Sequence, residues 1–204
     1  MPSMVRVTQA HIDAREDSIV ESALMLFARK GIEKTTVQEI AAAADLSAGA
    51  IYRYFSSKEK LLEAVFVHCI AHHREVFESE ARNAASPLAA LIDIGRHAVN
   101  EPADDPMRAL DVELTLAAKR DPQGVGVGRR AMRTAITDQV EQGLLRAREA
   151  GEIPESVAIH PLAVGLMALV AGIHVLQAEL GDQVDGEAAF NAVSDLVSKG
   201  LHSS

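Results

Sequence analysis

Hydrophobic residues recur at helical spacing near the start of the chain. One helix face is formed by Ile19, Val20, Ala23, Leu24 and Phe27, which follow the i, i+1, i+4, i+5, i+8 pattern. Gly31 comes next, where a left-handed glycine commonly ends a helix. Few stretches alternate between apolar and polar residues with the period of two that strands require. The pattern therefore predicts a helix over residues 13–30 and an all-α protein.

Capping residues mark the next three helices. Thr36 precedes Glu39 by three residues, which is the capping-box pattern and predicts a helix over residues 37–44. Ser47 can cap a helix over residues 48–54, and Ser56 or Ser57 can start a longer one that reaches about residue 83. Further helices are predicted from Pro87 onward and over residues 107–120, 129–150, 161–180 and 187–200, about nine in total. The glycine-rich run at 124–128 lacks the spacing of a phosphate-binding loop and is interpreted as a loop or frayed helix start.

Residues 36–58 have the pattern of a helix-turn-helix. Two short helices joined by a three-residue turn and packed on a first helix form this DNA-binding motif, whose second helix enters the major groove. The predicted shared core is Ile40, Ala44, Leu46, Ile51 and Phe55. The side chains predicted to face outward are Gln38, Ala48, Gly49, Ala50, Tyr52, Arg53 and Tyr54. Hydroxyl, amide, guanidinium and ammonium groups are the donors that hold phosphate oxygens on a duplex.

The segment "TTVQEIAAAADLSAGAIYRYFSSKEKLL" resembles the N-terminal domain of the tetracycline-repressor (TetR) family of bacterial transcriptional regulators. The resemblance covers about fifty residues, from the first helix into the fourth. It includes the Thr-Thr pair, the Ser-x-Gly of the turn, the Tyr-x-Tyr-Phe and the Ser-Lys-Glu that follows. Asp45 departs from the family pattern, which usually has glycine in the turn. Asp tolerates left-handed backbone better than most residues, so the same turn is expected.

The resemblance implies specific DNA contacts. Residues expected to contact backbone phosphates are Thr36, Tyr52, Tyr54 and Lys58, and those expected nearest the base edges are Gln38, Ala48, Gly49, Ala50 and Arg53. Hydrogen-bonded base reading would rest on Gln38, which suits adenine, and Arg53, which suits guanine. Outside this motif, the tyrosines would be interpreted as packing residues and Lys58 as a solvated charge. The implied domains are a DNA-binding domain at 10–57 and an effector-binding and dimerisation domain at 58–204.

The family resemblance also implies a homodimer that binds a double-stranded operator, most simply as a repressor. The last two helices, 161–180 and 187–201, would pack against their symmetry mates, and a small-molecule effector would bind among the helices between residues 88 and 176. Candidate pocket residues are His97, Met107, Leu110, Glu113, Leu114, Met132, Ile136, Met167 and His174. Each Met or Leu can equally be ordinary core. His97, Glu113 and His174 are the candidate polar anchors, although each can equally be a satisfied core histidine or a surface glutamate.

Charge and cysteine content limit the possible binding partners and the possible location of the protein. The net charge is −9, which argues against indiscriminate adhesion to nucleic acid or anionic membrane. Residues 1–60 carry eight Lys/Arg and eight Asp/Glu, while residues 61–204 carry twelve and twenty-one. The acidity thus lies outside the predicted DNA-binding segment. A single cysteine excludes an intramolecular disulfide framework, and no secretory signal is visible, so a cytoplasmic protein is expected.

Three other interpretations remain open. Residues 161–178 are uncharged and apolar and could span a membrane, but flanking Lys/Arg are absent, and we favour a helix buried on most faces. His68, Cys69, His72 and His73 have i, i+4 spacings that could share a metal ion, although each pair supplies only two ligands. A helical-bundle enzyme is the alternative function. The chain contains no Glu-x-x-His, HExxH or GxSxG motif, and no cofactor is expected.

Overall fold

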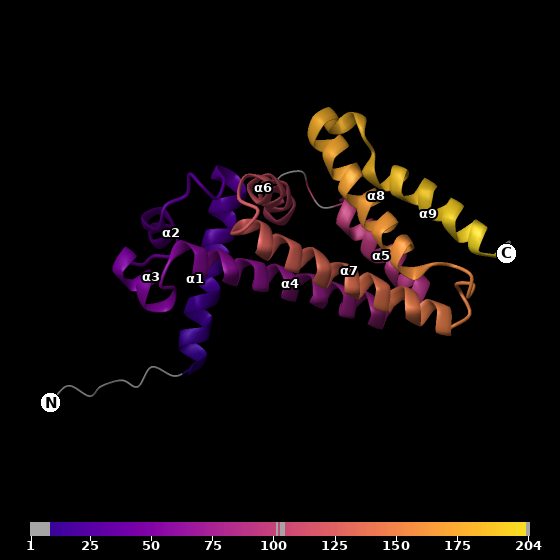
Figure 1. Ribbon diagram of the computed structural model, residues 1–204, viewed down its shortest axis with the longest axis horizontal. Helices are drawn as coiled ribbons and strands as arrows, with labels where there is room; N and C mark the ends of the chain where they lie inside the picture. The colour runs from indigo at the N-terminus through magenta and orange to yellow at the C-terminus, as the bar shows by residue number, and fades with distance from the viewer. Residues whose placement is uncertain (1–8, 101, 103–104, 203–204) are drawn as a thin grey trace. The chain divides into compact units, whose positions relative to one another are not determined.

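The computed structural model describes residues 9–100, 102 and 105–202. In this part of the chain all regular structure is helical, as predicted (Figure 1). The α-helices are α1 (Gln9–Lys30), α2 (Val37–Ala43), α3 (Ala48–Tyr54), α4 (Lys58–Asn83), α5 (Pro87–Asn100), α6 (Pro106–Arg120), α7 (Val125–Glu149), α8 (Ile159–Leu180) and α9 (Gly186–His202). A short 3-10 helix, η1 (Gly181–Gln183), follows α8. The chain divides into two compact units, which are described separately.

Unit 1 comprises residues up to Cys69 together with 109–129. It holds α1, α2 and α3, the start of α4, most of α6 and the start of α7. Its largest fully buried side chains include Ile19 and Phe27 of α1, Leu61 of α4, and Ile40 and Ile51 of the segment predicted to form a helix-turn-helix. Ala44 is buried as well, whereas Leu46 and Phe55, also predicted as core, are half-buried. The predicted core of the motif is thus largely confirmed.

α7 starts earlier than the sequence predicted, at Val125 instead of Arg129. The carboxylate of Asp121 accepts hydrogen bonds from the backbone N–H groups of Gly124 and Val125, both at 3.0 Å, and so satisfies the donors of the first turn. Gly128 lies inside this helix. Only glycine fits there without a rearrangement, because a Cβ would come within 2.4 Å of the Phe66 ring. Gly124 therefore lies in the turn before α7, and residues 125–128 form the first turn of this helix, with a close packing position at Gly128.

Unit 2 comprises residues 70–108 and 130–204. One apolar cluster joins α7 to α8, with Val140, Leu144 and Ala163 buried at its centre. A second cluster contains Val99 of α5, Ile173 of α8 and Phe190 of α9. α5 and α9 approach closely at Gly95, where a Cβ would lie 2.1 Å from the Phe190 ring. These clusters leave much of α8 outside the core.

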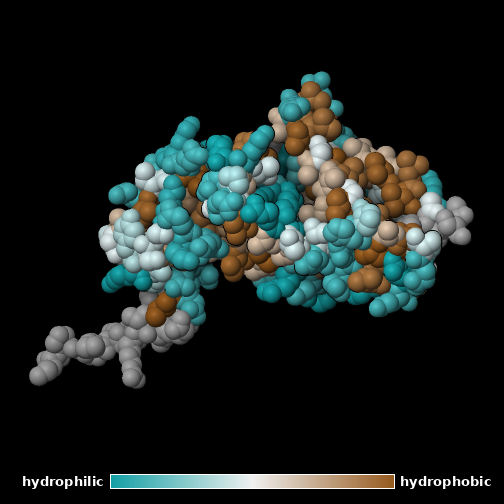
Figure 2. Space-filling model, in the orientation of Figure 1, coloured by the Kyte–Doolittle hydropathy of each residue, from teal (hydrophilic) through white to brown (hydrophobic). Residues whose placement is uncertain are grey.

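α8 is more exposed than the sequence predicted. Its exposed apolar side chains are Val164, Val175, Leu176 and Leu180, and the neighbouring α9 exposes Val193 and Leu196. Figure 2 shows hydrophobic residues at the surface in the part of the molecule where α8 and α9 lie. Ile159–Gln183 is long and apolar enough to cross a membrane by length and composition, and 11% of its most apolar window is buried. The expectation of burial on most faces fails within one chain, because the two clusters cover only one side of α8.

Candidate nucleic-acid interface

The connection between α1 and α2 is held by hydrogen bonds on both sides. Gly31 adopts the predicted left-handed conformation with φ +86°. The buried hydroxyl of Thr35 donates to the carbonyl of Gly31 at 2.8 Å and lies 3.3 Å from that of Leu26. From α6, the Glu113 carboxylate accepts the Ile32 N–H at 2.9 Å. The connection therefore enters α2 with a fixed geometry.

The predicted capping box at the start of α2 is confirmed. The Thr36 hydroxyl accepts the Glu39 N–H at 3.3 Å, and the Glu39 carboxylate accepts the Thr36 N–H at 2.9 Å. Lys30 at the end of α1 forms an ion pair with Glu39. Hydrogen bonds from Lys30 first, then from Thr36, lower the pKa of Glu39 to about 2. Thr36 itself stays exposed and available to a ligand.

The turn between α2 and α3 is a Schellman motif with aspartate in the glycine position. Asp45 has φ +55°. The Asp45 N–H donates to the carbonyl of Ala42 at 3.3 Å, and the Leu46 N–H donates to that of Ala41 at 2.8 Å. Asp45 therefore adopts the left-handed conformation expected for this departure from the family pattern.

α3 presents part of the predicted contact set to solvent. Ser47 caps the helix as predicted, accepting the Ala50 N–H at 3.1 Å. Gly49, Tyr52 and Arg53 are exposed, and Ala48 and Tyr54 are half-buried. Ala50 is buried beside Ile51, so its side chain faces the core, and we leave it out of the set proposed to contact bases. An added Cβ at Gly49 would meet no atom within 4 Å, so the surface there is open.

Gln38 and Lys58 complete the set. Gln38 is exposed on α2. Lys58 starts α4, and its ammonium lies 3.5 Å from the carbonyl oxygen of Glu33 in the α1–α2 connection. Partial burial lowers the pKa of Lys58, while the carboxylates of Glu59 and Glu33 act in the opposite direction. Ser57, not Ser56, caps this helix, since its hydroxyl accepts the Lys60 N–H at 3.3 Å.

All nine predicted DNA-contact residues lie in unit 1, on the start of α2, on α3 and on the start of α4. Sequence reasoning missed the roles of Thr35, Lys30 and Glu113, which orient α2. The Lys30–Glu39 pair joins residues nine positions apart, and Glu113 is 81 positions from Ile32. Neither separation matches a helical repeat, so no local pattern signals them.

The predicted effector residues are divided between the two units. Leu110, Glu113 and Leu114 belong to unit 1, and the other six belong to unit 2. Leu110, Leu114, Met132 and Ile136 are buried, Met107 and Met167 are half-buried, and His97 is exposed. The ring Nε2 of His174 lies 2.9 Å from the carbonyl oxygen of Ala98. Their contact with an effector stays a prediction.

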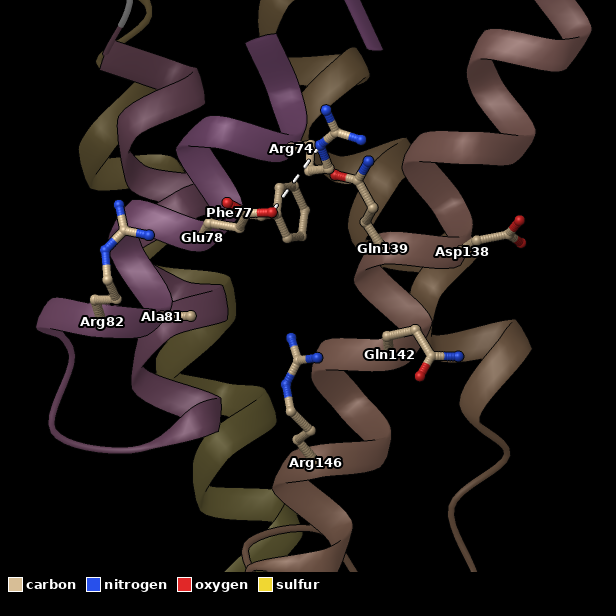
Figure 3. A pocket seen from close by; sticks show the side chains of 9 residues that line it. All are labelled: Arg74, Phe77, Glu78, Ala81, Arg82, Asp138, Gln139, Gln142 and Arg146. Carbon is tan, nitrogen blue, oxygen red and sulfur yellow. Dashed lines mark ion pairs between the residues drawn. The ribbon is translucent and has the colours of Figure 1, made fainter. Parts of the chain in front are cut away.

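A pocket of about 520 Å³ lies elsewhere in unit 2, between α4 and α7 (Figure 3). It is lined by Arg74, Phe77, Glu78, Ala81, Arg82, Asp138, Gln139, Gln142 and Arg146. None of the predicted effector residues lines it. Its volume is within the range of small-molecule sites.

The histidine and cysteine residues of α4 do not form a metal cluster. Within the described residues, no group of three or more His, Cys, Asp or Glu side chains is arranged to hold a metal ion. Cys69 is buried, and burial raises the pKa of its thiol to about 11, which disfavours the thiolate that binds metal. Metal binding by His68, His72 and His73 stays a hypothesis.

Comparison with known proteins identifies the helix-turn-helix. Residues 19–65, from α1 into α4, match the family described as "Bacterial regulatory proteins, tetR family". Residues 19–65 are a DNA-binding domain of the TetR family. The match contains α2, the Asp45 turn and α3, so the family is recognised by the same residues that form the candidate interface.

Relatives of the TetR type extend beyond this motif. The transcriptional regulator AcrR of Shigella flexneri is 26% identical over 174 residues, covering 83% of this chain and 81% of AcrR. The transcriptional repressor Rv1474c of Mycobacterium tuberculosis is 27% identical over 157 residues, covering 76% of this chain and 79% of the repressor. The crystal structure of a TetR-family transcriptional regulator from Rhodococcus sp. superposes with TM-score 0.80 at 22% identity, covering 93% and 99% of the two chains. This superposition confirms the fold class, and the protein is a DNA-binding transcriptional regulator.

Proposed function

We propose that the protein is a ligand-responsive repressor that binds a palindromic operator as a homodimer and leaves it when a small-molecule effector binds. The observation that carries the proposal is the exposure of Gly49, Tyr52 and Arg53 on α3 while the opposite side of this helix, at Ile51, is buried. A short helix with one face in a core and hydrogen-bond donors on the other is suited to the major groove. The repressor Rv1474c supports the direction of regulation.

The proposed contacts divide into two classes. Thr36, Tyr52, Tyr54 and Lys58 would bind phosphates and set the register of the protein on the duplex. Gln38, Ala48, Gly49 and Arg53 would lie at the base edges, with Gln38 and Arg53 supplying the hydrogen bonds that discriminate bases. Gly49 suits a position where backbone and DNA approach closely, because its Cα faces open space.

The proposed dimer interface is the exposed apolar surface of α8 and α9. Leu196 is 71% exposed and Val175 is 50% exposed, and a Cβ at Gly165 or Gly172 would meet nothing within 4 Å. Contiguous exposed apolar surface of this kind marks interaction sites in soluble proteins. A twofold interface buries the same surface on both subunits and places two recognition helices on the two halves of a palindrome.

The remaining features follow from this function. We propose a DNA-binding domain at 10–57, an effector-binding and dimerisation domain at 58–204, a cytoplasmic location and no catalytic role. An effector that binds one of two conformations better shifts the population toward it, and a coupling of a few kcal/mol suffices to release DNA.

The decisive experiment is selection of bound sequences from a random duplex pool by the full-length protein at near-physiological salt, where nonspecific phosphate attraction is weak. We expect an enriched palindrome. The Arg53→Ala variant, selected in parallel, should enrich a less defined motif. Absence of any enrichment by a folded, ligand-free dimer would contradict operator binding and favour the helical-bundle enzyme.

A further inference from the structure

Two arginines at the pocket between α4 and α7 have no carboxylate partner among the residues that the structure describes. The pocket carries three guanidinium groups, from Arg74, Arg82 and Arg146. Arg74 is 4.0 Å from Glu78 one helical turn away, and Figure 3 marks this pair. Within the part of the chain that the structure describes, neither Arg82 nor Arg146 forms an ion pair. The Arg146 side chain projects into the space between the two helices (Figure 3).

The helix dipole explains only part of this arrangement. Arg82 and Arg146 lie in the last turns of α4 and α7, where cations are favoured near the exposed carbonyl groups. The dipole does not explain a further polar group of the pocket lining, the side-chain oxygen of Gln139. This atom is buried and finds no hydrogen-bond partner among the described residues, although it belongs to a residue that lines the same pocket. Buried polar atoms are nearly always hydrogen-bonded, so this oxygen would take a partner from a water molecule or from a ligand.

The rest of the lining combines two apolar residues, Phe77 and Ala81, with the polar Glu78, Asp138 and Gln142. The Phe77 ring lies on the α4 side of the pocket near Gln139, and Ala81 leaves room one turn further along the helix (Figure 3). Phe77 also packs against the buried cluster around Val140 and Leu144. Pockets that combine apolar walls with a few convergent polar groups are typical of small-molecule sites.

We propose that this pocket binds a small organic anion, a carboxylate or phosphate ester on an apolar body. Guanidinium groups bind carboxylate and phosphate oxygens through paired hydrogen bonds. The anionic group would lie between Arg82 and Arg146, the apolar body against Phe77 and Ala81, and a polar substituent at Gln139. The proposal that this pocket binds an anion does not depend on whether the protein binds DNA. The use of the pocket as the effector site rests on the proposed function.

The test uses 2-naphthoate and 2-naphthyl phosphate as fluorescent probes and the neutral 2-naphthamide as the uncharged control. The chain contains no tryptophan, so probe anisotropy is measured over a low protein background. We expect one or both anions to bind the full-length protein more tightly than the amide does. The anion that binds more tightly distinguishes a carboxylate ligand from a phosphorylated one. Failure of both anions to bind at millimolar concentration would overturn the proposal.

Variants locate the binding. Arg146→Gln should weaken anion binding about tenfold, the scale of one charge-assisted contact. Arg130→Gln removes the same charge from an exposed position of α7 outside the pocket and should leave the affinity within about twofold of the original. Ala81→Leu keeps every charge and fills the pocket, so it should also weaken binding. Equal losses in the two arginine variants, or no effect of Ala81→Leu, would place the anion elsewhere.

A last measurement separates this proposal from the proposed function. The selected operator duplex is titrated with protein in the presence and absence of the anion that binds. Release of DNA by the original protein but not by Arg146→Gln would make the pocket the effector site. Anion binding without any operator binding would leave the pocket as a ligand site and contradict the repressor. Operator binding without anion binding would contradict the anion site and leave the proposed DNA-binding function standing.

Discussion

At the scale of single residues, the turn between α2 and α3 shows how closely sequence and backbone agree. Asp45 occupies a left-handed conformation with φ +55°, where the Cβ of an L-residue is crowded. The Asp45→Gly variant should raise the free energy of unfolding by about 1 kcal/mol, because glycine adopts this conformation without that cost. Denaturant midpoints would measure it. Asp45→Ala keeps the Cβ and should be no more stable than the original protein; equal stabilisation in both variants would refute the explanation.

Loss of a proposed phosphate contact and loss of a proposed base contact should affect DNA binding differently. Lys58→Ala should weaken binding to all duplexes alike and reduce the slope of log affinity against log salt by about one, because one phosphate contact is lost. Arg53→Ala should cost about 1–3 kcal/mol on the operator and relax the preference at one base pair. Anisotropy titrations on the operator and on single-base variants would separate the two effects. Loss of binding to one sequence only in Lys58→Ala would contradict its phosphate role.

Much of this interface could be predicted because its signals are local. The capping box of Thr36 and Glu39, the Ser47 cap and the Gly31 terminus each lie within four residues of the groups they satisfy. The burial of Ala50 could not be predicted. A small apolar residue fits either face of α3, and only the packing of α3 against the core decides between them.

At the scale of helices, the start of α2 should respond to acid. The pKa of Glu39 is lowered from its usual 4.5 to about 2 by the hydrogen bonds from Lys30 and Thr36. Its contribution to stability is therefore present above about pH 4.5 and is lost as the pH falls toward 2. Urea midpoints of the original protein and of Glu39→Gln should differ most near neutral pH and converge in acid. A difference that is constant with pH would show that ionisation of Glu39 contributes nothing.

α6 stabilises the DNA-reading helices through one carboxylate. Glu113 accepts the Ile32 N–H at 2.9 Å and lies 3.4 Å from Arg120, with 18% of its side chain exposed. Glu113→Gln should lower the free energy of unfolding by about 1–3 kcal/mol, since a hydrogen bond to a charged acceptor is replaced by a neutral one. Faster amide exchange at Ile32 would locate the loss.

Glu33→Gln is the matched control for this variant. Glu33 pairs with the same Arg120 at 2.9 Å, but its side chain is 70% exposed, and exposed ion pairs contribute little. Equal destabilisation by both substitutions would show that Arg120 pairing matters and that the Ile32 bond does not. The sequence offered Glu113 as a candidate polar anchor of the effector pocket or as a surface glutamate. Its contact with Ile32 could not be predicted from the sequence, because it joins α6 to the α1–α2 connection, 81 residues away.

At the scale of the whole molecule, the sequence predicted an apolar α8 but not which part of it a single chain would cover. Hydropathy records how apolar a helix is, whereas burial depends on the neighbours that the fold supplies. Ile173 lies in the cluster with Val99 and Phe190, while Val175 and Leu176 remain exposed on the same helix. The proposed symmetric partner would cover this surface and make its composition consistent with a protein in water.

The last prediction tests the proposed dimer. Leu196→Glu places a charge in the proposed interface at a position 71% exposed in one chain, so the monomer should fold with unchanged helical circular dichroism. Burying that charge against its symmetry mate is unfavourable, so sedimentation should show one chain where the original protein shows two. Val67→Glu, at a residue 66% exposed on α4, is the matched control and should remain dimeric.

The same two variants connect assembly to operator binding. A monomer has one recognition helix, so Leu196→Glu should bind the palindrome weakly and gain no affinity from its second half-site. Val67→Glu should bind as the original protein does. If Leu196→Glu were monomeric and kept full operator affinity, one helix-turn-helix would suffice for recognition. The exposed surface of α8 and α9 would then need a partner other than a second copy of this chain.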